Sequence, residues 1–551
     1  MGCFIFLSLC IGRLLFIQVF RSTYLAEIAK KQHNLFVELE PVRGIIYDTN
    51  LKPLAVNIPA DSLYASPVLI ADKEKTAAVL SNILNVDIDF LRQRLSRKKS
   101  FVWLARKVSP EQSAAVSKLN IKGLGFIRES RRSYPNQYLA SQIMGFAGLD
   151  NTGLEGLEMT FDRYLKGEPG WGVFLRDARQ KKLDIWEKMA LPKDGYSLVL
   201  TIDEVIQYIA ERELDKAFKA FRAKGATIIV MDPYTGAILA LANRPTYDPN
   251  QQTNSNKDQI RNRAVCDMFE PGSVFKIVAA SAAIEEKLIS EEDKFYCENG
   301  SWNAGPQILH DHKPHGWLTF SEVIGQSSNI GTAKAAKILG PEIIYRYVKL
   351  FGFGVKTGVD MPGEVSGVIR EPRFWSKNSL LAVPMGQEVG VTAMQLASAI
   401  SAIANGGELM RPYIVKEVRD KYGEIIKEFS PVEVRKVISA ETAERVKNIL
   451  RGVVDTGTGT LAKIDGMSAG GKTGTAQKLE PNGRYSHNKF IGSFIGFAPA
   501  EDPAVAVVVL LDEPHPYYGG VVSAPVFKNV ARDAIKYLNM KQQSRIVFNA
   551  D

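Results

Sequence analysis

The stretch GMSAGGKTGT, residues 466–475, fits two motifs that belong to different folds. Read from Gly466, it is G-x-x-x-x-G-K-T, the phosphate-binding loop that follows a buried strand and opens a helix. Read from Lys472, it is K-T-G, a motif carried by a β-strand beside a nucleophilic serine. The residues around the stretch decide between a nucleotide-binding fold and a sheet that has an edge strand at Lys472.

The flanking sequence favours the strand. After the motif, Gly474, Pro481 and Gly483 prevent the sustained helix that a phosphate loop needs. The Thr-rich segment KTGTAQK, residues 472–478, comes just before a predicted pair of strands and suits the edge of a sheet. We therefore reject nucleotide binding and predict a strand here.

Two predicted hairpins frame the C-terminal part of the chain. Each consists of two apolar segments around a short polar turn: ATIIVMD with AILALAN around DPYTG (226–243), and KFIGSFIGFA with AVAVVVLLD around PAEDP (489–512). Mostly helical segments lie between the hairpins. The sequence therefore predicts an α/β (α+β) fold in which an antiparallel sheet takes strands from both ends of a domain.

Two further helices are expected to open and close this domain. Apolar residues recur at helical spacing over 204–221, and Thr201 with Glu204 has the pattern of a capping box. The segment 524–538 has the pattern of the closing helix. A domain boundary is therefore expected near residue 200.

Composition sets broad limits on the class of protein. With 551 residues, two or more domains are expected, and 45% hydrophobic and 23% charged residues are typical of a globular protein. The net charge of +9 favours an anionic neighbourhood such as a membrane or cell-wall surface. Dense Lys/Arg tracts with interleaved aromatic residues are missing, so no nucleic-acid partner is expected.

The segment from Gly2 to Phe20, GCFIFLSLCIGRLLFIQVF, is long enough to cross a bilayer and is interrupted only by Arg13. It lacks the basic start and the small-residue cleavage site of a signal peptide, so we expect a single uncleaved anchor. The alternative is a buried N-terminal helix. Of the four cysteines, only Cys266 and Cys297 lie outside this segment, and we expect both to be buried free thiols rather than a bridge.

A nucleophile is predicted at EPGSVFK, residues 270–276, where Ser273 and Lys276 form an S-x-x-K pattern at the start of a helix. A spacing of three places both side chains on one face, within reach of each other. A serine hydroxyl needs an adjacent base to act as a nucleophile. Lys276 can be that base if its ammonium form is destabilised. The positive end of a helix, lying beside Lys472, would destabilise the ammonium form.

A third element is GQSSNIG, in which Ser327 and Asn329 form an S-x-N pattern in a loop between two predicted helices. The hydroxyl can relay a proton and the amide can hold a substrate backbone. Each motif alone occurs by chance in long chains, but their order S-x-x-K, S-x-N, K-T-G is specific.

In these three motifs the chain resembles the penicillin-recognising serine acyltransferases. More closely, it resembles a class B penicillin-binding protein, a monofunctional peptidoglycan D,D-transpeptidase. The resemblance runs from about Pro41 to Ala531 and includes RGIIYD, GLEGLEMTFDRYLKG, NRAVCDMFEPGSVFK and TAMQLASAISAIANGG. Asn329 fits the cell-division branch better than the elongation branch, which usually has aspartate there.

The resemblance implies a penicillin-binding transpeptidase fold, an antiparallel five-stranded sheet flanked by helices with a helical subdomain, over residues 201–551. An elongated α+β pedestal domain of the dimerisation type, residues 22–200, would precede it. The transmembrane anchor would be residues 1–21. This arrangement implies a single-pass protein of the inner (cytoplasmic) membrane with its catalytic domain outside the cytoplasm.

The family also implies roles for matching residues. Ser273 would attack the carbonyl of the penultimate D-alanine of a stem peptide, and Lys276 would take the serine proton. Ser327 would pass a proton onward, Asn329 would orient the peptide, and Lys472 would bind its terminal carboxylate.

On the same strand, Thr473, Gly474 and Thr475 would be substrate-binding residues, and Thr473 and Thr475 would bind the donor's terminal carboxylate together with Lys472. The backbone amides of Ser273 and Thr475 would form the oxyanion hole. A second stem peptide's amine would resolve the acyl-enzyme, β-lactams would be trapped on it, and no cofactor would be needed. The implied partners are a membrane-embedded glycan polymerase and other division proteins.

Several alternatives remain open at this point. A β-lactam hydrolase or D,D-carboxypeptidase would use the same motifs with water as acceptor, and a non-catalytic β-lactam sensor would acylate and then signal. The histidines of HDHKPH, His310, His312 and His315, resemble a metal cluster but have no further ligand at suitable spacing, so no metal is expected. Glu155 and Glu158 are interpreted as part of a structural turn.

Overall fold

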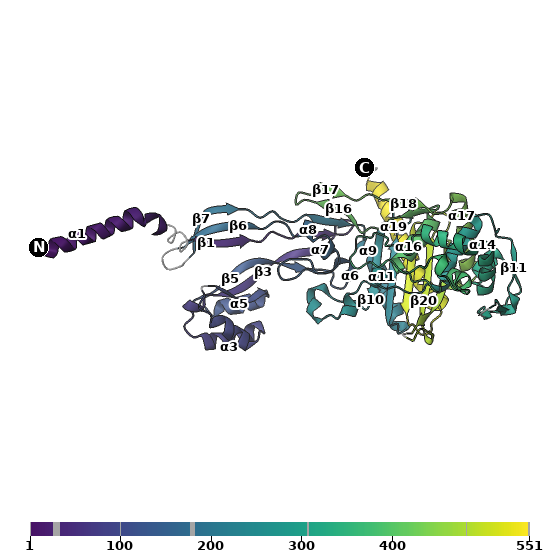
Figure 1. Ribbon diagram of the computed structural model, residues 1–551, viewed down its shortest axis with the longest axis horizontal. Helices are drawn as coiled ribbons and strands as arrows, with labels where there is room; N and C mark the ends of the chain where they lie inside the picture. Colours follow the sequence, from purple (N-terminus) through teal and green to yellow (C-terminus); the bar gives the residue numbers. More distant parts are fainter. Residues whose placement is uncertain are drawn as a thin grey trace. The chain divides into compact units, whose positions relative to one another are not determined.

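A computed structural model describes residues 2–25, 34–99, 101–176, 182–305, 308–480 and 482–548 (Figure 1). The chain divides into two compact units. The first unit consists of Met1–Gly44, Asn57–Arg131 and Arg163–Tyr196, and the second of Ile45–Val56, Arg132–Asp162 and Ser197–Asp551. Both units consist of several segments of the chain, and the single domain boundary expected near residue 200 stays a prediction.

The second unit is built on a five-stranded sheet with the order β10-β9-β21-β20-β19. Its strands are β9 (Gly225–Met231), β10 (Ile238–Arg244), β19 (Gly470–Leu479), β20 (Tyr485–Ala498) and β21 (Val505–Asp512). All neighbouring strands are antiparallel. The expected sheet, with strands from both ends of the domain, is confirmed; in Figure 1, teal β10 and yellow-green β20 belong to one sheet.

The segment that fits two motifs is a strand, and it lies at the edge of the sheet. In β19, Lys472 pairs with Ile495, Thr473 with Phe494 and Gly474 with Ser493 of β20. No other strand of the described chain pairs with the second side of β19. This side of β19 is therefore the open side of the sheet, in the sense that no described strand is paired with it.

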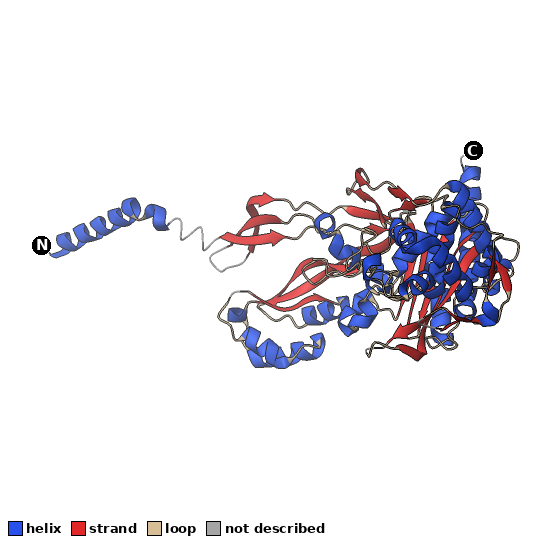
Figure 2. Ribbon diagram, turned by 45° about the vertical axis from the view of Figure 1, so that its right-hand side comes forward, coloured by secondary structure: helices blue, strands red, loops and turns tan. Residues whose placement is uncertain are grey.

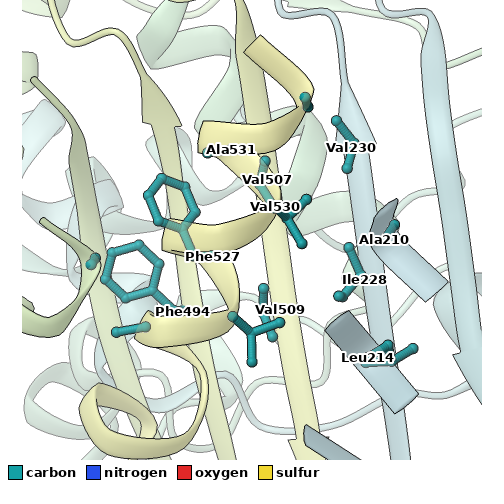
Figure 3. Close-up of a cluster of buried hydrophobic side chains, with 14 of the residues drawn as sticks. Ala210, Leu214, Ile228, Val230, Phe494, Val507, Val509, Phe527, Val530 and Ala531 are labelled. Atoms are coloured by element: carbon teal, nitrogen blue, oxygen red, sulfur yellow. The ribbon is translucent and has the colours of Figure 1, made fainter. Parts of the chain in front are cut away.

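Helices pack on both faces of the sheet. Figure 2 draws the helices in blue and the strands in red. Helices α9 (Glu204–Ala220) and α19 (Ala524–Phe548) lie on one face, where Ile228, Val507 and Phe527 are fully buried (Figure 3). Helix α16 (Ala393–Ala404) covers the other face, and its Ser401 hydroxyl lies 3.4 Å from the Met231 sulfur. Alternate residues of β9 therefore face different helices, as the pleat of a strand requires.

The start of α9 differs from the expected capping box. The helix begins at Glu204, and its cap is Asp203, whose carboxylate accepts a hydrogen bond from the Val205 amide at 3.0 Å. The Thr201 hydroxyl instead donates to the Ile238 carbonyl at 2.7 Å. Aspartate is as good an N-cap as threonine, and it lies one residue before the helix.

A helical subdomain accompanies the sheet. It contains the longer helices α12 (Lys276–Glu285), α14 (Asn329–Leu350) and α17 (Ala440–Asp455) and the shorter helices α13 (Phe320–Gly325) and α15 (Ser379–Ala382). Three other short helices of the unit are α10 (Lys257–Ile260), α11 (Arg263–Cys266) and α18 (Gly519–Val522), of which α11 and α18 contact strands of the five-stranded sheet. Small two-stranded sheets join β11 (Lys294–Tyr296) to β14 (Trp317–Thr319), β12 (Ser301–Asn303) to β13 (Ile308–His310), and β15 (Glu408–Met410) to β18 (Glu433–Lys436).

The second unit also contains strands that lie outside the five-stranded sheet. Strand β8 (Ser197–Leu200) pairs antiparallel with β16 (Val415–Arg419) and parallel with β2 (Ile46–Tyr47), and β16 pairs with β17 (Ile425–Glu428). The short helices α6 (Ser141–Met144) and α7 (Gly156–Thr160) belong to the same unit.

Within that unit, Glu158 of α7 is fully buried and pairs with Arg132, the Oε1 to Nε distance being 2.6 Å. The Tyr134 hydroxyl donates to the same carboxylate oxygen at 3.2 Å. A buried carboxylate requires such partners. Glu158 thus contributes to packing, as the structural interpretation of Glu155 and Glu158 predicts.

The first unit contains two groups of elements. One is the sheet of β1 (Asn34–Leu39), β6 (Gly170–Arg176) and β7 (Lys182–Ala190). The other contains β4 (Val102–Val108), the later part of β3 (Pro53–Ala65) and β5 (Leu124–Ser133) up to Arg131, with α3 (Lys73–Leu84), α4 (Ile88–Leu95) and α5 (Pro110–Lys118). Apolar residues of the second group, among them Leu63, Leu80 and Leu91, form its core.

The N-terminal helix α1 (Gly2–Leu15) continues into a π-helical turn, Phe16–Phe20. Gly2–Phe20 has a mean hydropathy of 2.2 over its most apolar window, and no part of that window is buried. It is the one helix in the described part of the chain that is long and apolar enough to cross a membrane. A membrane anchor accounts for these exposed apolar side chains.

Replacing Phe527 by alanine is expected to lower the free energy of unfolding of the second unit by about 3–5 kcal/mol, because a fully buried ring leaves a cavity. Urea denaturation followed by circular dichroism measures the change. In the control Phe374→Ala, the lost ring is 63% exposed, and the change should stay below about 0.5 kcal/mol. Equal effects of the two substitutions would contradict the packing role of Phe527.

Candidate active site

Ser273 lies in a one-turn 3₁₀ helix, Gly272–Phe275, that leads directly into α12. Gly272 has a φ of 59°, a conformation that favours glycine. A Cβ atom built on Gly272 would lie 3.1 Å from the Ala476 Cβ and 3.3 Å from the Thr475 carbonyl oxygen. The turn that carries Ser273 therefore packs directly against the edge strand β19.

Lys276 is the first residue of α12, and its side chain is fully buried. Its Nζ donates to the Ser327 carbonyl oxygen at 2.6 Å, to the Asn329 Oδ1 at 2.9 Å and to the Ser327 hydroxyl at 3.3 Å. In the described part of the chain, no hydrogen bond joins Lys276 to the Ser273 hydroxyl, although a 3₁₀ turn places residues three apart above one another.

Lys472 approaches the same point from β19. Its Nζ donates to the Ser327 hydroxyl at 2.9 Å and to the Thr473 carbonyl oxygen at 3.2 Å, and its side chain is fully buried. Ser327, in a left-handed conformation with φ 60°, lies between α13 and α14, and its hydroxyl contacts both amines. The S-x-x-K, S-x-N and K-T-G segments therefore meet in one place.

Burial controls the charge of both lysines. It lowers the pKa of Lys276 to about 7, against the opposing effect of the Asp311 carboxylate. Burial, and secondarily the charge of Lys276, also lowers the pKa of Lys472 well below its ordinary value. Near neutral pH a substantial fraction of Lys276 is thus an uncharged amine that can accept a proton.

The other K-T-G-T residues line the edge strand. The Thr473 and Thr458 hydroxyls are 2.7 Å apart, and the Thr475 hydroxyl accepts a hydrogen bond from the Gly519 amide at 3.1 Å. Gly474 has no room for a side chain, since a Cβ there would lie 2.3 Å from the Ser493 Oγ and 2.9 Å from a Val274 methyl group. Gly474 is therefore required for the close packing of β19 on the serine turn.

The sequence analysis missed Asp311 and Thr458. Asp311 lies in the HDHKPH stretch, of which only the histidines were considered as candidate ligands. Its carboxylate accepts hydrogen bonds from the Ser328 hydroxyl and from two backbone amides of α14. No local motif marks either contact.

Two histidines of HDHKPH contact neighbouring residues of the site. The ring of His312 lies 5.0 Å from that of Tyr518, and the His310 carbonyl accepts a hydrogen bond from the Asn329 side chain. Across the described residues, no group of three or more His, Cys, Asp or Glu side chains is placed to hold a metal ion. Cys266 and Cys297 are free thiols as predicted, although Cys266 is only half-buried.

This arrangement suits proton transfer at a serine. An uncharged amine one helical turn from a hydroxyl can act as a general base, and a second hydroxyl between two amines can pass a proton between them. The turn at Ser273 and the strand at Thr475 place two backbone segments side by side, from which amides could bind an oxyanion.

Comparison with known families agrees with the fold and the motifs. Residues 226–532 match the family model described as the penicillin binding protein transpeptidase domain, which is the fold that the resemblance implies. Residues 38–200 match the penicillin-binding protein dimerisation domain. The chain belongs to the class B penicillin-binding proteins, in which a dimerisation domain precedes a transpeptidase domain.

Named relatives extend over nearly the whole chain. Stage V sporulation protein D of Bacillus subtilis is 37% identical over 539 residues, covering 96% of this chain and 83% of that protein. The peptidoglycan D,D-transpeptidase FtsI of Escherichia coli is 30% identical, covering 98% and 91%. Penicillin binding protein 3 of Mycobacterium tuberculosis, solved with aztreonam, is similar with a TM-score of 0.72 and 30% identity, covering 91% and 97%.

Replacing Gly474 by alanine is expected to slow labelling by a fluorescent penicillin at least tenfold, because the added methyl group would push β19 away from the serine turn. The rate of appearance of the labelled band on a gel measures the effect. A matched control is Gly452→Ala in α17, where an added Cβ meets no atom within 4 Å. Wild-type labelling by Gly474→Ala would contradict the steric argument.

Proposed function

We propose that this penicillin-binding protein is a peptidoglycan D,D-transpeptidase that cross-links stem peptides through an acyl-enzyme on Ser273. The observation that carries the proposal is the meeting of Lys276 and Lys472 at the Ser327 hydroxyl, next to the serine turn. The names of the relatives, which include peptidoglycan D,D-transpeptidases, support the reaction class.

In the first step, the Ser273 oxygen attacks the carbonyl carbon of the penultimate D-alanine, and uncharged Lys276 accepts the hydroxyl proton. The peptide C–N bond then breaks, and the proton returns through the Ser327 hydroxyl to the nitrogen of the departing D-alanine. The products are an ester on Ser273 and free D-alanine. The contacts of Ser327 with Lys276 and Lys472 suit this transfer.

In the second step, the amine of another stem peptide attacks the ester carbonyl. The new amide bond forms as the Ser273–acyl bond breaks, and the amine's proton returns to the serine oxygen. The cross-link is complete and the enzyme is regenerated. A β-lactam enters the first step in the same way, but its amine stays attached, so the ester persists.

The donor peptide is proposed to lie along the open side of β19 as an additional extended strand. Lys472, Thr473 and Thr475 would bind its terminal carboxylate, with Gly474 keeping the strand close to the serine turn. Asn329 would orient the peptide backbone. The amides of Ser273 and Thr475 would form the oxyanion hole, in which one donor is worth about 3–4 kcal/mol of barrier.

The setting of the reaction is also part of the proposal. The anchor at residues 1–21 would hold the protein in the inner membrane, with the pedestal, residues 22–200, and the transpeptidase domain, residues 201–551, outside the cytoplasm. Septal synthesis with a membrane-embedded glycan polymerase is the proposed role. A relative named for sporulation favours a spore-wall role as the second candidate, and depletion in growing cells separates the two: filamentation supports division.

Ser273→Ala is expected to abolish labelling by a fluorescent penicillin, because the acyl group has no oxygen to bind. Labelling of the purified full-length protein on a gel measures this. Ser281→Ala in α12 changes a buried serine outside the site and should still label. Persistent labelling of Ser273→Ala would refute the nucleophile, and rapid loss of label from wild type would favour the hydrolase.

The acylation rate of wild type is expected to rise with pH, with a midpoint near pH 7. Burial lowers the pKa of Lys276 to about 7, and only its uncharged form accepts the serine proton, so activity is lost as the pH falls below that value. Stopped-flow rates with a chromogenic cephalosporin from pH 5 to pH 9 measure the profile. A flat profile over this range would rule out Lys276 as the base.

A further inference from the structure

Asp311 follows β13 and reaches the S-x-N segment although it lies far from it in the sequence. Its Oδ2 accepts a hydrogen bond from the Ser328 hydroxyl at 2.6 Å, and its Oδ1 accepts from the Asn329 amide at 2.5 Å and the Ile330 amide at 3.0 Å. Three donors on one carboxylate fix both its position and that of the segment.

This carboxylate lies at the N-terminus of α14, whose local cap is Ser328. The Ser328 hydroxyl accepts a hydrogen bond from the Gly331 amide at 2.9 Å. The other two amides of the first turn, those of Asn329 and Ile330, donate to Asp311 instead. A negative charge is favoured at this end of a helix. The backbone on both sides of Ser328 is therefore held by Asp311.

The two residues next to Ser328 are those that contact the lysine. Ser327 supplies a carbonyl and a hydroxyl to Lys276, and Asn329 supplies its side-chain oxygen. Any movement of the segment would alter all three contacts. Asp311 thus controls the position of the acceptors around Lys276 without touching the lysine.

Asp311 also acts on Lys276 by its charge. The ionisable groups that face Lys276 are the Asp311 carboxylate, the Cys297 thiol and, across Ser327, the Lys472 amine. Asp311 and Cys297 both raise the pKa of Lys276, with Asp311 the larger of the two, and thus oppose the effect of burial. Without Asp311, Lys276 would hold a proton less well.

We propose that Asp311 is a positioning residue that holds Ser327 and Asn329 around Lys276 and supplies the negative charge that lets this lysine both accept and return a proton near neutral pH. The inference rests on the proposed function. Lys276 takes the Ser273 proton during attack, and the same proton must later be available to the leaving amine. An amine with too low an affinity for protons would perform the first transfer poorly.

The test uses Asp311→Asn, which keeps the size of the side chain and removes its charge. Acylation by a chromogenic cephalosporin is measured from pH 5 to pH 9 on the full-length protein. The plateau rate should fall about tenfold or more, because the segment loses an acceptor. The midpoint of the acid limb should move to lower pH by about one unit, since the charge that favours the ammonium form is gone.

Asp360→Asn is the matched control. The Asp360 carboxylate also accepts hydrogen bonds from two backbone amides, Ile414 at 2.8 Å and Val415 at 2.7 Å, but it is not among the groups that act on Lys276. This variant should keep the wild-type midpoint whatever its effect on stability. Asp311→Glu restores the charge and should keep the midpoint closer to wild type than Asp311→Asn does, with a lower plateau.

An unchanged midpoint in Asp311→Asn, with or without a fall in rate, would overturn the proposal. If Asp311→Asn does not fold by circular dichroism, Asp311→Glu decides: a wild-type plateau would overturn the positioning role. Failure of the proposed function is recognised separately, because it removes the acid limb from wild type or leaves Ser273→Ala labelled.

Discussion

The structure depends on two lysine side chains buried beside one hydroxyl. Burying an isolated ammonium group is unfavourable in free energy, and a second ammonium nearby makes it more so. The pKa values of both amines are therefore lower than in water. The protein compensates with oxygen acceptors from the S-x-N segment and from β19 itself. Because Lys276 comes from a helix and Lys472 from a strand at the edge of the sheet, the packing of the helices on the sheet brings the two amines together and buries them.

Close approach of backbones makes that packing possible. Gly272 and Gly474 face each other's segments across the boundary between the serine turn and β19, and a Cβ on Gly386 would lie 2.2 Å from the Gly272 carbonyl oxygen. Glycine at these three positions lets three chain segments meet without side chains between them. An unpaired edge of a sheet can associate with strands of other chains, and at β19 the serine turn packs against the edge strand.

Much of this could be predicted from the sequence. The glycines and proline after Lys472 exclude a helix, which identifies the edge strand, and the three motifs together predict one site, at which the structure joins Lys276, Ser327 and Lys472. Asp311 and Thr458 could not be found in this way, because their partners lie elsewhere in the chain and no periodicity relates them. The cap of α9 was misassigned because two capping residues, Thr201 and Asp203, stand close together and only packing selects between them.

The five-stranded sheet combines strands that are far apart in the sequence, and this affects the order in which it can form during translation. Strands β9 and β10 pair with each other and are made before the rest of the sheet, but the other neighbour of β9, which is β21, and the lysine-bearing strand β19 are made only from Gly470 onward. Until then the nascent chain carries the β9–β10 hairpin with an unpaired edge on β9, and an unpaired strand edge is prone to aggregate. The contacts among Lys276, Ser327 and Lys472 can therefore form only after most of the polypeptide, including β19, has left the ribosome.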